Sequence, residues 1–435
     1  MIKAAISPQD LRRRIYVKAK AEKQHRFWGL YAHVCKLDVL REAYTQAKAN
    51  GGAPGIDGVT FAEVEAAGLD GFLDGIRKEL VEKTYKPAPS RRVQIPKGHG
   101  KTREIRIATI RDRVVQGAVR YVLEGIFEAD FCSNSYGYRP KRSAHQAIDG
   151  VRQSIHHRLT VVLDVDLAAY FDSVKQDILL AKIAKRVNDD QVLKLIRKIL
   201  RSNGKRGVPQ GGPLSPLLSN IYLNEVDWSF QRLIEQMRQG RFERLAYWRY
   251  ADDMVILGTC LPTHRWVSEK ARRQLEKELK RLEVQLNFEK TRLVDLDRDE
   301  TFSFLGFDFR LKQSKTGKKV ALITPKSKKR VELIRRVGET LRRNRHLTVK
   351  QVVEKVNPIP VGFVNYFRIG HSARTFTKVR WVVERLVRRF ATRAMGRCGY
   401  GWKRWSSEVV YERWRLFNRY HVAYIYHGPT KVAPT

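Results

Sequence analysis

Two adjacent aspartates, Asp252 and Asp253, lie between two strongly apolar segments, LAYWR and MVILG. These segments predict two strands that reverse direction at the Ala251–Asp253 corner. In a loop between exposed strands, such a pair would be an ordinary Asp-rich turn. Here the flanks are too apolar for an exposed turn, and paired carboxylates in such surroundings are costly unless a cation neutralises them. The sequence therefore favours a cation site at this corner.

A second group of carboxylates, Asp164, Asp166 and Asp172, accompanies the apolar run LTVVLDV, which predicts a buried strand. If this strand neighbours the corner, Asp166 and Asp252 would together hold two Mg²⁺ ions about 3.5–4 Å apart. Such a pair of ions supports in-line displacement at phosphorus, with one ion activating a 3′-hydroxyl and the other holding the leaving pyrophosphate. The spacing along the chain leaves open whether the two strands are neighbours.

The net charge of the chain indicates what kind of molecule it binds. The chain carries 85 Lys and Arg against 45 Asp and Glu, a net charge of +40, with 43% hydrophobic residues. A chain this apolar folds, so the charge indicates a polyanion, most simply nucleic acid. From residue 310 to residue 405 there are 27 Lys or Arg against 4 Asp or Glu, a net charge of +23. Apolar residues recur there at helical spacing, which predicts a helical domain with one basic face. A merely solvated helix face accounts poorly for so large a charge.

Other classes of protein are disfavoured. No run of about 18 apolar residues is present, so no membrane-spanning helix is predicted. The N-terminus lacks the apolar core of a signal peptide, and we expect a cytoplasmic protein. The four cysteines lie far apart, which supports neither a disulfide framework nor a CxxC metal site.

The order of predicted elements gives the α+β class. Helical periodicity extends to about residue 85, and SRRVQIPK and TREIRIAT then predict a basic β-hairpin around the turn signal GHGK. Strands and helices alternate from there to about residue 310, which predicts a sheet with helices packed on it. Helices dominate the basic region that follows.

A family resemblance rests on motifs in a fixed order: DVDLAAYFDSV, GVPQGGPLSPLLSNIYLNEVD, YADD, LNFEKT and FLGFDF. In this order they resemble the successive motifs of a reverse transcriptase. YKPAPSRRVQIPKGHGKTREIRIATIRDRVVQGAV and SYGYRPKRSAHQAI are similar, more narrowly, to group II intron-encoded reverse transcriptases, also called maturases. The resemblance is to the bacterial type without an HNH endonuclease domain, because Cys398 has no nearby cysteine and His421 and His427 are isolated. The priming strand would then come from elsewhere, for example from a replication fork.

The resemblance implies a right-hand polymerase, with fingers and an antiparallel palm sheet, followed by an α-helical thumb. We expect an N-terminal helical extension (1–85), reverse transcriptase fingers and palm (86–310), a helical thumb or maturase domain that binds RNA (311–395), and a basic aromatic C-terminal extension (396–435). Phe304-Leu305-Gly306 matches the primer-grip hairpin.

The resemblance also implies the catalytic residues, Asp166, Asp252 and Asp253, which would bind two Mg²⁺ ions together with the backbone carbonyl of Leu167. Phe171 would exclude a 2′-hydroxyl and so select deoxynucleotides. Taken alone, Phe171 would be a core aromatic.

Further contacts to the incoming deoxynucleotide are implied for Lys97, Arg103, Gln210, Gly211 and Lys290. Lys97 and Arg103 would grip the triphosphate from the fingers hairpin, or else that hairpin lies on a phosphate backbone. Gln210 and Gly211 would lie beneath the templating base pair, where a small residue permits close approach; otherwise they are a loop before a helix. Lys290 would lie near the leaving pyrophosphate, or is a surface lysine.

For the RNA contacts, the interpretation is that basic residues of the thumb bind phosphates: Arg374, Lys378, Arg385, Arg388 and Arg389. Tyr366, Phe367, Trp381 and Phe390 are interleaved with them, and such aromatics either stack unpaired bases or pack in the core.

The implied function is an RNA-directed DNA polymerase that copies intron RNA into cDNA and assists splicing by binding and stabilising the intron RNA. Its partners would be the intron RNA, an RNA template with a DNA primer, and target DNA, with dimerisation left open. Two alternatives are a splicing-only maturase and a domesticated reverse transcriptase in phage defence or DNA repair. The intact aspartates argue against the first, and the thumb resemblance argues against the second.

Overall fold

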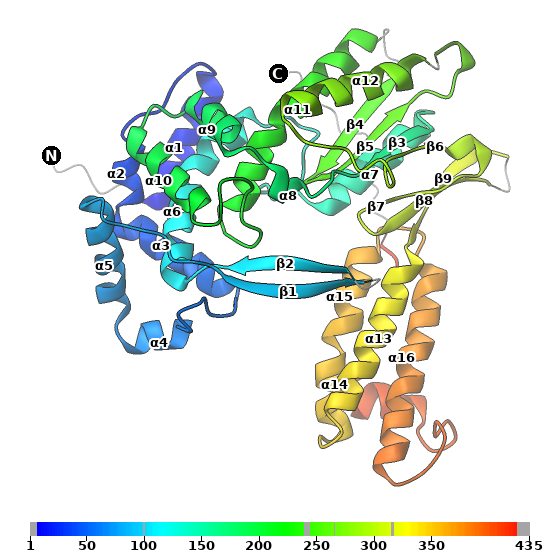
Figure 1. The fold of residues 1–435 in the computed structure, drawn as a ribbon. Helices are drawn as coiled ribbons and strands as arrows, with labels where there is room; N and C mark the ends of the chain where they lie inside the picture. The colour runs from blue at the N-terminus through cyan, green and yellow to red at the C-terminus, as the bar shows by residue number, and fades with distance from the viewer. Residues whose placement is uncertain (1–6, 99–100, 239–243, 265, 315–316, 424–435) are drawn as a thin grey trace. The chain divides into compact units, whose positions relative to one another are not determined.

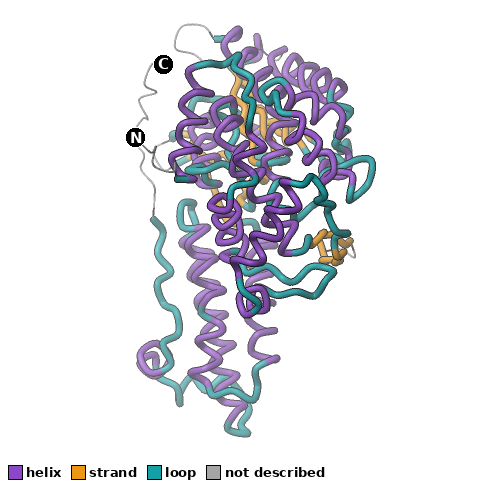
Figure 2. The backbone as a smooth tube through the Cα atoms, turned by 90° about the vertical axis from the view of Figure 1, so that its left-hand side faces the viewer, coloured by secondary structure: helices purple, strands orange, loops and turns teal. Residues whose placement is uncertain are grey.

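The computed structural model describes residues 7–98, 101–238, 244–264, 266–314 and 317–423 (Figure 1). The chain divides into two compact units. Unit 1 comprises residues 1–147 and 165–292, and unit 2 comprises residues 148–164 and 293–435. Three elements lie at the boundaries along the chain: α7 (Ala144–His156), β3 (Val161–Val165) and β6 (Arg292–Asp295). Figure 2 shows that strand is the minor component and that most of the described chain is helix or loop.

Unit 1 is built mainly from helices around the buried α6 (Ile110–Asp130), against which α1 and α3 pack. The hydroxyl of Thr109 caps α6 by accepting the backbone N–H of Asp112. The other helices of the N-terminal part are α1 (Pro8–Ala21), α2 (Leu30–Val34), α3 (Leu37–Ala49), α4 (Phe61–Ala66) and α5 (Leu69–Val81). The later ones are α8 (Tyr170–Ser173), α9 (Gln176–Ala184), α10 (Asp190–Arg201), α11 (Ser215–Met237) and α12 (Trp266–Arg281), with a 3₁₀ turn at Pro262–His264.

The two hairpins of unit 1 confirm the strands predicted there. β1 (Arg91–Gly98) and β2 (Lys101–Ile107) pair antiparallel, with Arg91 opposite Ile107. Residues 99–100 of the predicted turn lie outside the described residues. β4 (Leu245–Tyr250) and β5 (Asp253–Gly258) also pair antiparallel, with Tyr250 opposite Asp253. The chain therefore reverses over a two-residue turn, Ala251 and Asp252, at the predicted corner.

The sheet of unit 2 has the order β7 (Phe302–Phe304), β8 (Phe307–Gln313) and β9 (Lys319–Pro325). Leu305 and Gly306 form the two-residue turn between β7 and β8, and their φ angles of 49° and 80° suit a tight hairpin. The predicted primer-grip segment is therefore a hairpin. β9 was not among the predicted strands. β3 and β6 are also neighbours in a sheet, with a short 3₁₀ turn (Leu296–Arg298) following β6.

The helical region of unit 2 confirms the prediction for the basic part of the chain. Its helices are α13 (Ser327–Arg343), α14 (Val349–Val356), α15 (Pro358–Phe367) and α16 (Ala373–Ala394), and a π-helical turn spans Val409–Arg413. Leu333, Val337 and Leu341 form the buried stripe of α13, and α13 packs on α16. No helix in the described part of the chain has an apolar stretch long enough to cross a membrane.

The two compact units divide the chain on a different basis from the predicted functional domains. The hairpin of β7 and β8 belongs to the same unit as α13–α16, whereas the prediction places residues up to 310 in the palm. The segment after residue 395 packs back on these helices: the indole N–H of Trp405 donates to the Thr392 hydroxyl, and the Asn357 amide donates to the carbonyl of Arg415. The division by function stays a prediction.

Candidate active site

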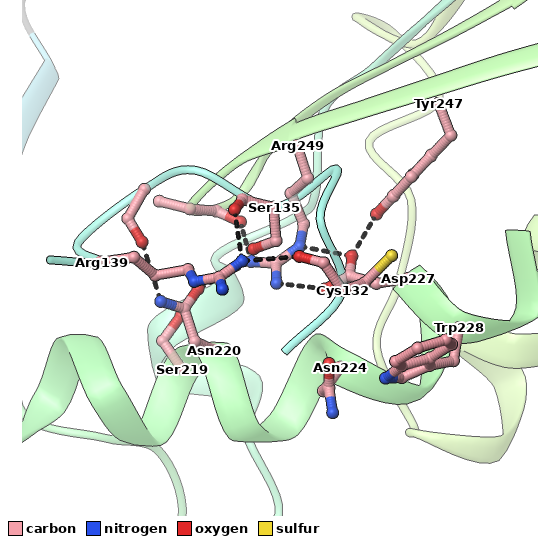
Figure 3. Close-up of polar contacts among 12 residues, drawn as sticks. Cys132, Ser135, Arg139, Ser219, Asn220, Asn224, Asp227, Trp228, Tyr247 and Arg249 are labelled. Carbon is pink, nitrogen blue, oxygen red and sulfur yellow. Dashed lines mark hydrogen bonds and ion pairs between the residues drawn. The ribbon is translucent and has the colours of Figure 1, made fainter. Parts of the chain in front are cut away.

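Arg249 and Asp227 form a fully buried ion pair (Figure 3), and Arg249 lies two residues before the turn of Ala251 and Asp252. Arg249, the fifth residue of β4, binds the carboxylate of Asp227 in α11 through Nε at 2.7 Å and Nη2 at 2.5 Å. The Tyr247 hydroxyl donates to the same carboxylate at 2.7 Å. Nη1 of Arg249 donates to the carbonyl of Ala251 and to Oδ1 of Asn220, both at 2.9 Å. The turn is thereby tied to α11.

Burial and charge act in opposite directions on the pKa of Arg249. Burial alone lowers the pKa of Arg249, but the Asp227 carboxylate outweighs it and the pKa is raised. Burial, reinforced by the same carboxylate, raises the pKa of Tyr247 far above its ordinary value. Arg249 is therefore charged and Tyr247 neutral, so both act as donors to Asp227.

A second support for the turn is the segment 134–137. The amide N–H of Tyr136 donates to the carbonyl of Arg249 at 2.9 Å, and the Asn220 side chain donates to the carbonyl of Gly137 at 2.8 Å. A Cβ at Gly137 would lie 2.3 Å from the backbone nitrogen of Ala251, so no larger residue fits there. Ala251 is itself left-handed, with φ of 58°. Our sequence reasoning missed this role, although Gly137 lies in the quoted motif SYGYRP.

We expect Gly137→Ala to lower the free energy of unfolding by about 1–3 kcal/mol, because the added methyl group meets backbone that cannot yield. The measurement is the urea midpoint of the full chain. Gly75→Ala, in the interior of α5, is the matched control: its Cβ would meet nothing within 4 Å, and it should stabilise by at most about 1 kcal/mol. A Gly137→Ala protein as stable as the wild type would refute the close packing.

Asp166 follows β3 and is held by the chain segment 285–291. The backbone N–H of Asn287 donates to the carbonyl of Asp166 at 2.8 Å, and that of Ala168 donates to Gln285 at 2.9 Å. Nζ of Lys290 lies 3.3 Å and 3.4 Å from the two carboxylate oxygens of Asp166. Both side chains remain partly exposed, 38% for Asp166 and 55% for Lys290. The structure thus brings together two of the predicted site residues that are 124 positions apart.

Phe171 lies in the short helix α8 and is 8% exposed. Its ring packs edge-on against Tyr170, with ring centroids 5.3 Å apart, and its carbonyl accepts the N–H of Val208 at 2.7 Å. Burial raises the pKa of Tyr170, and the charge of Asp252 adds to the rise. Phe171 is therefore packed in the core beside Tyr170, whose pKa is raised in part by the charge of Asp252.

The basic hairpin meets the Gly-rich loop before α11. Nε of Arg103 donates to Oε1 of Gln210 at 2.5 Å, and the backbone N–H of Arg106 donates to the carbonyl of Gln210 at 2.8 Å. Gly211 has φ of 115°, and a Cβ there would lie 2.8 Å from the carbonyl oxygen of Arg106. Three predicted residues, Arg103, Gln210 and Gly211, are therefore adjacent. Lys97 belongs to β1, and its side chain lies outside the described part of the structure.

Tyr138 connects this hairpin electrostatically to the Asp252 turn. It has φ of 59° and remains 55% exposed. Its pKa is raised by burial and then by the charges of Asp252 and Asp253, whereas Arg103 lowers it. Tyr138 is another functional candidate that our sequence reasoning missed.

The carboxylates do not form a ready-made metal cluster. Among the described residues, no three His, Cys, Asp or Glu side chains are gathered closely enough to hold a metal ion. The chemistry of the donors nevertheless suits a hard cation, because Asp166, Asp252 and Asp253 supply only carboxylate oxygens, the ligands that Mg²⁺ takes up. The ammonium group of Lys290 beside Asp166 supplies one positive charge there.

Comparison with known proteins identifies the family. Residues 95–309 match the family described as reverse transcriptase (RNA-dependent DNA polymerase), and residues 331–409 match the group II intron, maturase-specific domain. Protein YkfC of Escherichia coli K12 is 33% identical over 362 residues, which cover 74% of this chain and 93% of that protein. This chain belongs to the group II intron reverse transcriptase and maturase family. The resemblance and the α+β polymerase fold inferred from the motifs are thus confirmed.

Two other matches are more distant. The group II intron-encoded protein LtrA of Lactococcus lactis is 28% identical over 365 residues, or 67% of this chain and 58% of LtrA, so the reverse transcriptase described here spans little more than half of that relative. A solved structure of apo telomerase from Candida tropicalis, truncated from its C-terminal domain, has a TM-score of 0.39 and 16% identity, and covers 51% of this chain and 54% of that chain. At that level the likeness supports no argument.

Within the maturase-specific domain, one predicted RNA contact is wrong. Arg388 is 2% exposed, forms an ion pair with Glu384 at 2.6 Å and donates to the carbonyl of Trp405. Its guanidinium is committed to the core and cannot reach a phosphate. Phe367 is likewise buried, as the packing alternative required.

The other predicted RNA contacts remain accessible to differing degrees. Arg374, Lys378 and Arg389 are exposed on α16. Arg385 is partly buried, and its guanidinium lies 4.6 Å from the ring centroid of Trp381. These four residues stay candidates for phosphate contacts.

Proposed function

We propose that this protein copies the RNA of a group II intron into cDNA and that its maturase-specific domain binds the same RNA and stabilises its splicing-competent fold. The observation that carries the proposal is the presence, in one chain, of both family domains together with a rigidly supported Asp252 turn. The intron RNA, an RNA template with a DNA primer, and target DNA would be its partners. The surplus of positive charge in unit 2 supports such polyanionic partners.

In this proposal Asp166, Asp252 and Asp253, with the carbonyl of Leu167, hold two Mg²⁺ ions. When bound, these ions activate a 3′-hydroxyl and stabilise the leaving pyrophosphate. The chain itself supplies orientation: the Arg249 ion pair fixes the Asp252 turn, and segment 285–291 fixes the backbone of Asp166. Lys290, which lies beside Asp166, would neutralise charge that develops on the pyrophosphate.

Residues of the hairpin and the loop would hold the incoming nucleotide. Arg103 presents a planar fork suited to bidentate phosphate binding, and Gln210 orients it by accepting its Nε–H. Lys97 would add a point charge on the same hairpin. Gly211, without a side chain, lets the loop lie directly against β2.

Phe171→Ala should reduce the preference for deoxynucleotides over ribonucleotides by roughly 10–100-fold, because the ring that excludes a 2′-hydroxyl is lost. The measurement is the ratio of kcat/KM values for dNTP and rNTP incorporation. Phe127→Ala is the control, since it also removes a buried phenyl ring in unit 1 but should leave this ratio unchanged. An unchanged ratio in Phe171→Ala would leave the residue as a core aromatic.

The test of the proposed function is DNA primer extension on an RNA template with dNTPs and Mg²⁺, alongside splicing of the intron RNA with and without the protein. Extension together with accelerated splicing supports both activities. Tight RNA binding without extension would instead indicate a splicing cofactor, and extension without any effect on splicing would indicate a domesticated reverse transcriptase.

A further inference from the structure

A groove runs between α13 and α16, which lie side by side in unit 2 (Figure 1). It encloses about 650 Å³, a volume typical of sites for small molecules or for parts of larger ligands. Its apolar lining includes Ile334, Leu341, Leu386 and Phe390. Gly338 also lines the groove and projects no side chain into it. The space beside it is open, because nothing lies within 4 Å of the place where its Cβ would be. We call this feature the α13/α16 groove.

Only positive charge lines the α13/α16 groove. Its basic residues are Arg335, Arg342, Arg345, Arg389 and Arg393, and none of the residues lining it is acidic. Arg335 forms an ion pair with Glu339 on its own helix. Among the described residues, no carboxylate forms a salt bridge with the other four. A concentration of guanidinium groups around an apolar surface suits an anionic ligand that also carries an apolar part.

An unpaired nucleotide has this combination of properties. Its base offers an apolar face that stacks on aromatic or aliphatic side chains, and the flanking phosphates bind arginine. A duplex offers its phosphates but keeps its bases stacked inside, so it could not fill the apolar floor. Free phosphate would use the arginines and leave Leu341, Leu386 and Phe390 without a role.

The exposed face of α16 extends this surface beyond the groove. Trp381, Arg385 and Arg389 lie four residues apart on one stripe of α16. The Arg385 guanidinium lies 4.6 Å from the Trp381 ring centroid and 5.5 Å from that of Tyr400, and Arg389 lies 5.7 Å from Tyr400. Trp381 is 51% exposed. Arg389 thus belongs both to the α13/α16 groove and to an ordered row of alternating rings and guanidinium groups.

We propose that the α13/α16 groove binds an unpaired base in a loop of RNA, with the adjoining row on α16 receiving the nucleotides that follow. The proposal rests on the RNA binding described under the proposed function and deepens it. It names the structural class of RNA that this domain recognises, unpaired nucleotides in a loop, and the residues that recognise it.

The test uses the full chain and three probes: an RNA hairpin with an adenosine loop, the same hairpin with abasic loop positions, and a blunt RNA duplex of equal length. Gly338→Leu fills the groove without changing its charge, and it replaces a helical glycine with a better helix former. We expect it to weaken binding of the adenosine-loop hairpin about tenfold, as for the loss of one stacked base, and to leave the other two affinities unchanged. Gly362→Leu, in α15, is the control, since its Cβ would also meet nothing within 4 Å.

The charge of the groove is tested separately. Arg342→Gln/Arg345→Gln removes two arginines that line the groove, one in the last turn of α13 and one two residues after its end. Arg336→Gln/Arg343→Gln removes two exposed arginines of α13 that do not line it. The first pair should weaken binding of the adenosine-loop hairpin about tenfold more than the second. Equal losses would overturn the proposal.

Two further outcomes would also overturn it: wild-type affinity of Gly338→Leu for the adenosine-loop hairpin, or equal losses on the abasic hairpin or the duplex. Failure of this inference differs from failure of the proposed function. In the latter case the wild-type protein would not bind the RNA hairpin at all.

Discussion

Asp252→Ala will abolish cDNA synthesis and leave RNA binding intact. The Asp252 carboxylate lies in the two-residue turn between β4 and β5, and the contacts of that turn with Arg249 and Gly137 are made by the backbone. Removing the carboxylate therefore changes little in the fold, but under the proposed mechanism it withdraws a metal ligand worth several kcal/mol of transition-state stabilisation. Such a loss corresponds to a fall of about 10³-fold or more in rate. Primer extension on an RNA template measures it, and equilibrium binding of the same RNA measures the second half of the prediction.

The control for Asp252→Ala is Asp177→Ala, which removes an exposed carboxylate from the first turn of α9. It should extend primers at nearly the wild-type rate. An Asp252→Ala protein that still synthesised cDNA would remove this residue from the active site. Parallel loss of extension and of RNA binding would contradict the separation of the two roles between the palm and the maturase-specific domain.

The corner that carries Asp252 could be predicted from sequence because its signal is local. The apolar segments on either side predict two strands, and the few residues between these segments are enough only for a tight turn. The hairpin of β1 and β2 could also be predicted from a local pattern, two strand-like segments around the turn signal GHGK. For Asp166 the local pattern predicts only a carboxylate after a buried strand, and its role beside Asp252 is implied by the ordered set of motifs.

The supports of the site could not be predicted in this way. Arg249 occupies an ordinary position in a strand, and its partner Asp227 lies in a helix 22 residues earlier. Lys290 and Asp166 are 124 residues apart. Nothing in the spacing of either pair distinguishes it from charges that face solvent. These contacts exist only because tertiary packing brings the segments together, and the same is true of the backbone approach at Gly137.

The basic stripe of α16 shows the same limit. Arg385, Arg388 and Arg389 lie within five consecutive residues of α16, and local sequence alone does not distinguish them. In the structure Arg388 faces inward, where Glu384 neutralises it, whereas Arg389 faces solvent. The packing of α16 decides which of the two neighbours, Arg388 or Arg389, is accessible to RNA. The positive charge of the region alone could not distinguish the buried arginine from the exposed one.

Asp227→Leu should destabilise the protein by about 3–5 kcal/mol, because it leaves the guanidinium of Arg249 buried without a counter-charge. Both side chains are fully buried, with 0% exposure. Tyr247 loses its acceptor as well. Urea denaturation of the full chain measures the effect. The control is Arg272→Ala, which breaks an exposed ion pair with Glu276 on α12 and should cost less than about 0.5 kcal/mol. Equal costs would mean that the buried pair contributes little.

A double variant separates the stability of the pair from its role in the site. In Arg249→Met/Asp227→Leu no unpaired charge is left buried at this place, so most of the lost stability should return. Primer extension should stay low, because the carbonyl of Ala251 and Oδ1 of Asn220 have then lost the donor that fixes the turn. Stability and extension recovering together would show that Arg249 serves only the core. Recovery of stability without extension would show that a charged residue is retained inside this sheet because it positions the catalytic turn.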